Sequence, residues 1–139
     1  KQTLHLTPAG SGVSLLREDE PSVRRLACEV LSRAGYIVLE AGDGVEGLAR
    51  AQSHPTRIDL LLTDLVLPGL SGRSLAEGFE RCQPDGGVLY MTGYAREVEG
   101  AGQAGFETGA LLMKPFSRST LLRAARARID AVARPRETA

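Results

Sequence analysis

The sequence predicts a three-layer α/β domain built on a parallel sheet of five strands. Short apolar runs bounded by turn residues alternate along the chain with stretches whose apolar residues recur at helical spacing. The clearest run, residues 60–62, is Leu-Leu-Leu, as expected for a strand covered on both faces. Strands that alternate with helices imply parallel pairing through right-handed crossovers. A chain of 139 residues suits one domain of this kind.

The first element of the domain follows a separate leader. Residues 1–12 contain a brief alternating pattern around Leu4 and Leu6, and residues 8–12 form a Pro- and Gly-containing joint. Residues 13–16 are an apolar run and predict the first strand. Pro21 suits the first turn of a helix, whose apolar rhythm runs from residue 23 to residue 34 and stops at Gly35.

The middle of the chain predicts three more strands and two more helices. Residues 36–39 and the central run 58–64 read as strands, separated by a short helix over residues 45–52. A helix over residues 75–82 follows, with Ser71 as its candidate cap. Residues 88–91 predict the fourth strand.

The last third of the chain completes the pattern. Residues 95–103 have a helical rhythm, but Gly100 and Gly102 weaken this fourth helix by about 1 kcal/mol each. Residues 111–113 predict the fifth strand and residues 121–132 the final helix, with residues 134–139 frayed. We therefore expect five strands and five helices, the fourth helix being the weakest.

Composition excludes several classes of protein. Lys and Arg balance Asp and Glu at 17 each, which argues against a broad basic surface for nucleic acid. No apolar run approaches the roughly 20 residues of a membrane span, and no secretory signal is visible, so we expect a cytoplasmic protein without direct membrane contact. Cys28 and Cys82 read as reduced core residues, and the isolated His5 and His54 predict no histidine metal site.

Chemically useful residues follow four of the predicted strands. Glu18 and Asp19 follow the first strand, Asp64 ends the third, Thr92 ends the fourth and Lys114 follows the fifth. The carboxyl ends of parallel strands meet at one edge of a sheet, where open α/β proteins place their ligands. From its own segment alone, Asp64 could equally be a residue that only caps a turn before Pro68. The polar residues at the other strand ends favour a shared site.

Three carboxylates in one pocket require a proton or a cation, because two unit charges roughly 4 Å apart repel by about 4 kcal/mol at a dielectric constant near 20. Oxygen ligands with open positions suit Mg²⁺, which also favours a phosphate partner. A carboxylate there can attack phosphorus and carry the phosphoryl group as an acyl phosphate. Lys114 could then neutralise the phosphoryl oxygens, and the Thr92 hydroxyl could donate to them.

These motifs together resemble the receiver domain of two-component signalling. The matching stretches are Glu18-Asp19, TDLVLPGLSG at residues 63–72, MTGYA at residues 91–95 and KPF at residues 114–116. The resemblance implies a flavodoxin-like (CheY-like) fold with strand order 2-1-3-4-5. It places the receiver domain at residues 13–133, between the leader at 1–12 and a tail at 134–139.

The resemblance also implies roles for single residues. Asp64 corresponds to the aspartate phosphorylated by a histidine-kinase phosphohistidine, Thr92 to the switch hydroxyl, and Lys114 to the lysine that pairs with the phosphoryl group. The bond before Pro115 is typically cis in this family. For Mg²⁺ the implied ligands are Asp64, Asp19, the backbone carbonyl of Val66 and, through water, Glu18.

The leader hints at the context of the domain. Residues 3–8, TLHLTP, resemble the final strand of a histidine-kinase ATP-binding domain, which implies a hybrid histidine kinase. Cloning residues or an unrelated leader, and hence a stand-alone receiver, remain the alternative. The implied partners are a histidine kinase or the chain's own kinase core, or a histidine phosphotransfer domain, and no nucleic acid. Whether the domain counts as an enzyme, through its own phosphorylation and dephosphorylation, and its oligomeric state both stay open.

Two residues depart from the family pattern. Arg17 stands where receivers usually carry an apolar residue at the end of the first strand, and a charge conflicts with a strand covered on both faces. Arg17 could compete for the acidic cluster and weaken Mg²⁺ binding, or could place its head in water. Leu111 replaces the usual switch aromatic, so we expect phosphorylation to act on the order of the glycine-rich segment 93–109 instead.

Three other functions compete with a phospho-accepting receiver. A pseudo-receiver that only binds partners conflicts with the complete set of site residues. A hydrolase of the haloacid-dehalogenase type would need a second Asp at position 66, where the chain has Val66. A flavin-binding protein would need a phosphate loop.

The remaining basic cluster consists of Arg123, Arg126 and Arg128 near the end of the last helix. It is interpreted as a solvated helix face.

Overall fold

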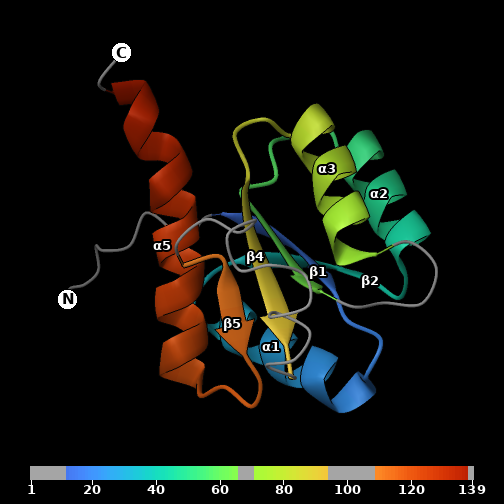
Figure 1. Cartoon of the computed structure of the whole chain (residues 1–139), viewed down its shortest axis with the longest axis vertical. Helices are drawn as coiled ribbons and strands as arrows, with labels where there is room; N and C mark the ends of the chain where they lie inside the picture. Colours follow the sequence, from blue (N-terminus) through green and yellow to red (C-terminus); the bar gives the residue numbers. More distant parts are fainter. Residues whose placement is uncertain (1–11, 66–70, 94–108, 138–139) are drawn as a thin grey trace.

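The computed structural model describes residues 12–65, 71–93 and 109–137, and it shows a five-stranded parallel sheet between two layers of helices (Figure 1). The strands are β1 (Val13–Arg17), β2 (Ile37–Ala41), β3 (Leu60–Asp64), β4 (Gly87–Thr92) and β5 (Leu111–Met113). Their order in the sheet is β2-β1-β3-β4-β5 and every neighbouring pair is parallel. The predicted fold class and strand order are confirmed.

Four helices lie within the described residues: α1 (Pro21–Arg33), α2 (Gly44–Ser53), α3 (Gly72–Cys82) and α5 (Arg118–Glu137). Helices α1 and α5 cover one face of the sheet, and α2 and α3 cover the other (Figure 1). The fourth predicted helix, at residues 95–103, lies outside the described part of the chain.

The core consists of two apolar layers, one on each face of the sheet. Alternate residues of the central strands divide between them, since successive side chains of a strand point to opposite faces. Leu16, Leu60 and Leu62 pack with α1 and α5, whereas Leu15 and Leu61 pack with α2 and α3. Burial on both faces explains why the central strand reads as a continuous apolar run.

Local signals begin and end the helices as the sequence predicts. Pro21 occupies the first turn of α1, and Gly35 follows its end with φ of 106°. The positive φ is the conformation that glycine adopts without strain after a helix. The side chain of Ser71 accepts a hydrogen bond from the Ser74 N–H, so the predicted cap of α3 is confirmed.

Helix α5 corrects two predictions. It continues to Glu137, so the expectation of frayed residues from position 134 is wrong. Arg128 is only 5% exposed, and its Nε donates to the Val88 carbonyl at 2.9 Å. The predicted solvated face therefore does not include Arg128, because α5 packs directly against β4 and turns this residue toward the sheet. No helix in the described ranges has both the length and the apolar run to cross a membrane.

Candidate functional site

The carboxyl ends of β3, β4 and β5 lie side by side at one edge of the sheet. Asp64 and Thr92 are the last residues of their strands, and Lys114 follows β5 directly. The Leu65 N–H donates to the Met91 carbonyl at 2.9 Å, and the Lys114 N–H donates to the Thr92 carbonyl at 2.8 Å. These two bonds fix the three chain exits relative to each other. The bond between Lys114 and Pro115 is cis, as the resemblance implied.

Glu18 and Asp19 complete an acidic cluster with Asp64 at this edge. One carboxylate oxygen of each residue lies within 4.8 Å of the other two. Glu18 and Asp64 are buried, whereas the side chain of Asp19 is about half exposed, at 51%. Two of the three carboxylates are therefore buried inside the protein, and the third is open to solvent.

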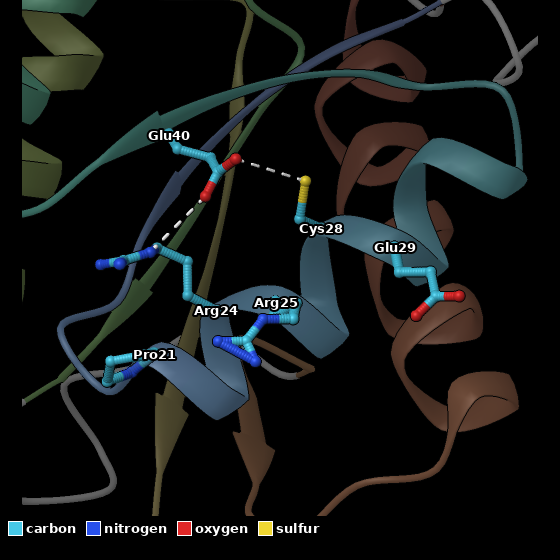
Figure 2. Close-up of a pocket in the computed structure, with 6 residues that line it drawn as sticks. All are labelled: Pro21, Arg24, Arg25, Cys28, Glu29 and Glu40. Atoms are coloured by element: carbon cyan, nitrogen blue, oxygen red, sulfur yellow. Dashed lines mark hydrogen bonds and ion pairs between the residues drawn. The ribbon is translucent and has the colours of Figure 1, made fainter.

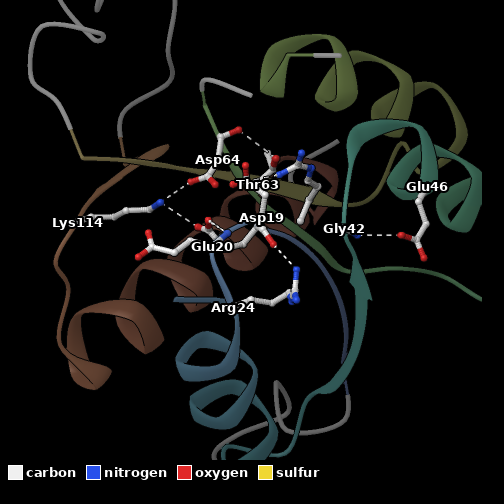
Figure 3. Close-up of polar contacts among 10 residues, drawn as sticks. Asp19, Glu20, Arg24, Gly42, Glu46, Thr63, Asp64 and Lys114 are labelled. Atoms are coloured by element: carbon white, nitrogen blue, oxygen red, sulfur yellow. Dashed lines mark hydrogen bonds and ion pairs between the residues drawn. The ribbon is translucent and has the colours of Figure 1, made fainter. Parts of the chain in front are cut away.

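Lys114 joins the two buried acids. Its Nζ lies 2.7 Å from Asp64 Oδ1 and 2.9 Å from Glu18 Oε1, and Figure 3 shows its side chain pointing toward Asp64. The Lys114 side chain keeps 21% of its surface exposed. A single ammonium group thus bridges two carboxylates while it remains in contact with the open side of the site.

Contacts from the N-cap and the first turns of α1 hold Glu18 in place. The Glu20 N–H donates to Glu18 Oε2 at 3.0 Å, and Arg24 Nη1 donates to the Glu18 backbone carbonyl at 2.8 Å (Figure 3). Arg24 could not be recognised from the sequence, because nothing in its local pattern distinguishes it from any other polar residue in the first turns of a helix.

Arg24 also borders a shallow pocket of about 460 Å³ beside α1 (Figure 2). Its Nε lies 3.5 Å from Glu40 Oε1, and the thiol of Cys28 donates to Glu40 Oε2 at 3.5 Å. Burial, and then the neighbouring Glu40, raise the pKa of the Cys28 thiol above its ordinary value of 9.0. Cys28 and Cys82 are free cysteines, but both are only partly buried at the edge of the core and are not the core residues that the sequence predicted.

The electrostatics of the buried acids are unequal. Burial, followed by the contact with Glu18, raises the pKa of Asp64 from 3.8 to about 7. Burial also acts to raise the pKa of Glu18, but hydrogen bonds with Asp64, the Glu20 N–H and Lys114 outweigh it and hold that pKa below 4.5. The two carboxylates raise the pKa of Lys114 above its ordinary value despite burial. At neutral pH, Asp64 is therefore the acid most readily protonated.

The donor set fits a hard divalent cation. Glu18, Asp19 and Asp64 offer only carboxylate oxygens, which Mg²⁺ prefers, and Asp19 leaves one side open to water. Val66, whose backbone carbonyl the resemblance implied as a further ligand, lies outside the described residues.

The backbone around Asp64 is tightly packed. The Thr63 hydroxyl donates to the Asp64 carbonyl at 3.1 Å, and a Cβ on Gly72 would overlap that same carbonyl oxygen. A glycine at the start of α3 thus allows the helix to approach the end of β3 closely.

Arg17 is the residue that departs most from expectation. Only 1% of its surface is exposed, so the interpretation that its head lies in water is wrong. Its Nη1 lies 3.9 Å from Asp19 Oδ1. Leu111, the other departure, is half-buried in β5 and pairs with Tyr90 of β4. Residues 94–108 of the predicted switch segment lie outside the described ranges.

Comparisons with known proteins agree on one family. The family model described as "Response regulator receiver domain" matches residues 15–126. The chain is 32% identical over 113 residues to "Sensor kinase CckA" of Brucella abortus (strain 2308), covering 81% of this chain and 12% of that protein. It is 33% identical over 102 residues to "Response regulator receiver protein CpdR" of the same strain, covering 73% of this chain and 83% of that protein.

A solved structure gives the same result. The crystal structure of the receiver domain from the hybrid histidine kinase CckA superposes with a TM-score of 0.70 at 33% identity, covering 85% of this chain and 99% of that one. The match to the sensor kinase is thus confined to a small part of that longer protein, whereas the match to the isolated receiver domain is nearly complete.

Proposed function

The chain belongs to the response regulator receiver domain family, and on that premise we propose that Asp64 accepts a phosphoryl group from a phosphohistidine. One observation carries the proposal. The buried Asp64 carboxylate, at the end of the central strand, shares a lysine with Glu18 inside a cluster of acidic oxygens. This arrangement combines a nucleophile, a fixed positive charge and ligands for a divalent cation.

In the proposed reaction, a carboxylate oxygen of Asp64 attacks phosphorus as the bond between phosphorus and the imidazole nitrogen breaks. The bonding electron pair returns to that nitrogen, which stays as neutral imidazole after taking a proton. The product is an acyl phosphate on Asp64. A proton on Asp64 must leave first, since burial raises its pKa to about 7 and only the carboxylate is a nucleophile.

Lys114 and Thr92 serve the transferred group. Lys114 Nζ, 2.7 Å from Asp64 Oδ1, lies where it can pair with a phosphoryl oxygen attached to that carboxylate. Thr92 ends the neighbouring strand and can donate its hydroxyl to another phosphoryl oxygen. When bound by Glu18, Asp19 and Asp64, Mg²⁺ supplies further neutralisation of the phosphoryl charge.

A phosphorylation assay with mass detection tests this function. Incubation with acetyl phosphate and Mg²⁺ should add one phosphoryl group to the intact protein, and Asp64→Asn should abolish the addition. Asp43→Asn is the matched control, because Asp43 caps α2 from an exposed position and asparagine caps equally well. Phosphorylation of Asp64→Asn would refute the proposal. Failure of the wild type with both acetyl phosphate and a histidine-kinase donor would favour the pseudo-receiver alternative, which the intact site otherwise disfavours.

The wider context follows from the same premise. The similarity to a sensor kinase over 12% of its length supports a hybrid-kinase context, whereas the match over 83% of the receiver protein CpdR supports the stand-alone alternative. We propose the first, with the receiver at residues 13–133 of a cytoplasmic hybrid histidine kinase and the leader at 1–12 before it. Its partners would then be the kinase core of its own chain or a histidine phosphotransfer domain. Transfer of labelled phosphate from an isolated kinase core to this domain, at a rate above that from unrelated kinases, would support that placement; equal rates would contradict it.

A further inference from the structure

Arg17 is a buried cation whose hydrogen bonds are largely unmade. It ends β1, has 1% of its surface exposed, and among the described residues its Nε and Nη1 have no hydrogen-bond partner. Burying a charge without hydrogen bonds is costly, so a nearby anion must compensate for it. Among the described residues, the anion within ion-pair distance is Asp19, whose Oδ1 lies 3.9 Å from Arg17 Nη1.

The neighbouring strands explain how an arginine fits here. Arg17 pairs in register with Ala41 of β2 on one side and with Thr63 of β3 on the other. Ala41 belongs to the core layer under α2 and α3, which shows the face that this row of residues shares. Small neighbours leave room for a long side chain, whose charged end is then confined beneath the acidic edge.

Arg17 lowers the net negative charge of the acidic cluster. Lys114 already offsets one charge of the three carboxylates, and Arg17 offsets a second without any bound ion. An arginine keeps its charge at every physiological pH. The electrostatic attraction for a divalent cation is therefore weaker than it would be with an apolar residue at position 17.

We infer that Arg17 is a resident counter-ion of Asp19 that competes with the divalent cation and lowers its affinity for the acidic cluster. The inference rests on the proposed function, because it concerns the cation site that serves Asp64. The ion pair with Asp19 is long, and within the described part of the chain Nε and Nη1 make no hydrogen bond, so a cation that binds Asp19 breaks no short hydrogen bond from these two nitrogens. Arg17 acts through Asp19 and is a positioning residue.

The test measures Mg²⁺ affinity directly, by isothermal titration calorimetry on the full chain without any phosphodonor. Arg17→Met keeps a long unbranched side chain and removes the charge, and replacing a poorly paired buried charge with an apolar group is often neutral or stabilising. We expect Arg17→Met to bind Mg²⁺ about tenfold more tightly than the wild type, equivalent to about 1.4 kcal/mol. Arg17→Lys, which keeps the charge, should stay within about threefold of the wild type.

Arg57→Met is the matched control for loss of one positive charge. Arg57 is exposed, pairs with Asp59 and precedes β3, at the opposite end of the strand from Asp64. The affinity of the Arg57→Met variant for Mg²⁺ should equal that of the wild type. Equal affinities of Arg17→Met and Arg57→Met would overturn the inference.

A second measurement covers the case in which Arg17→Met does not fold. In NMR spectra of the wild type, the side-chain Nε–H resonance of Arg17 should shift on saturation with Mg²⁺, whereas that of Arg57 should not. An unchanged Arg17 resonance would contradict the inference. Phosphorylation of Asp64 at saturating Mg²⁺ is measured in parallel. If the protein is phosphorylated but its Mg²⁺ affinity is the same with and without Arg17, only the inference is refuted. If the protein is not phosphorylated but its Mg²⁺ affinity depends on Arg17, only the proposed function is refuted.

Discussion

The raised pKa of Asp64 predicts that, without divalent cations, the wild type loses stability as the pH rises toward neutrality. The folded-state pKa of about 7 exceeds the ordinary value of 3.8, so between these values the unfolded chain has released a proton that the folded protein keeps. Stability from this group is complete below pH 3.8, declines as the pH rises and levels off above about pH 7. Asp64→Asn removes the titrating group and should remove this decline.

The magnitude follows from the size of the shift. One pH unit in this window corresponds to about 1.4 kcal/mol, so the limit between pH 5 and pH 8 is about 3 kcal/mol. Asp19 leaves one side of the cluster open to water, which limits the desolvation that raises the pKa of Asp64 and reduces the expected difference to about 1.5 kcal/mol. The wild type should therefore lose about this much relative to Asp64→Asn.

Urea unfolding followed by circular dichroism at pH 5, 6, 7 and 8 in EDTA measures the effect. The difference in unfolding free energy between wild type and Asp64→Asn should grow with pH, whereas Asp43→Asn should follow the wild type at every pH. Parallel curves for wild type and Asp64→Asn would refute the argument from burial. Saturating Mg²⁺ should restore part of the lost stability, because a ligand that binds only the folded state stabilises it.

Three further substitutions test single contacts. Lys114→Met should slow phosphorylation by acetyl phosphate at least about tenfold, because the fixed positive charge beside Asp64 is lost; an unchanged rate in a mass-detected time course would contradict this. Gly72→Ala should lower the unfolding free energy by at least about 2 kcal/mol, since its Cβ overlaps the Asp64 carbonyl oxygen; a wild-type urea midpoint would count against the close approach. Ser71→Ala should cost about 1 kcal/mol in the same assay, and Ser71→Asn should retain wild-type stability because asparagine also caps.

Local patterns in the sequence were enough for the architecture. Apolar runs, helical spacing and turn residues depend on neighbours within a few positions, so they predicted the five strands in sequence order and the helices α1, α2, α3 and α5. The strand order 2-1-3-4-5 came from the family resemblance and is confirmed. The predicted ends of the helices and strands were less accurate than their order. The final helix runs on to Glu137, because helical geometry continues past the point where the apolar rhythm ends.

The location of the site was also accessible from the sequence. Parallel strands direct all their carboxyl ends to one edge, so polar residues that follow separate strands can be expected to meet there. Asp64 Oδ1 and Lys114 Nζ lie 2.7 Å apart in this way, although the two residues are 50 positions apart in the chain. The sequence indicated the neighbourhood, and the structure supplied the bridge from Lys114 to Glu18 as well.

The sequence by itself determined the fold class and the set of residues gathered at the sheet edge, because these follow from periodicity and strand direction. Only the tertiary structure decided which charges are buried and what they contact. Arg17 and Arg128 both looked able to reach water, yet Arg17 is buried on the sheet face that α2 and α3 cover, and Arg128 is buried against β4. Burial is a property of segments brought together from distant parts of the chain, and the dielectric environment that sets the pKa of Asp64 arises only there.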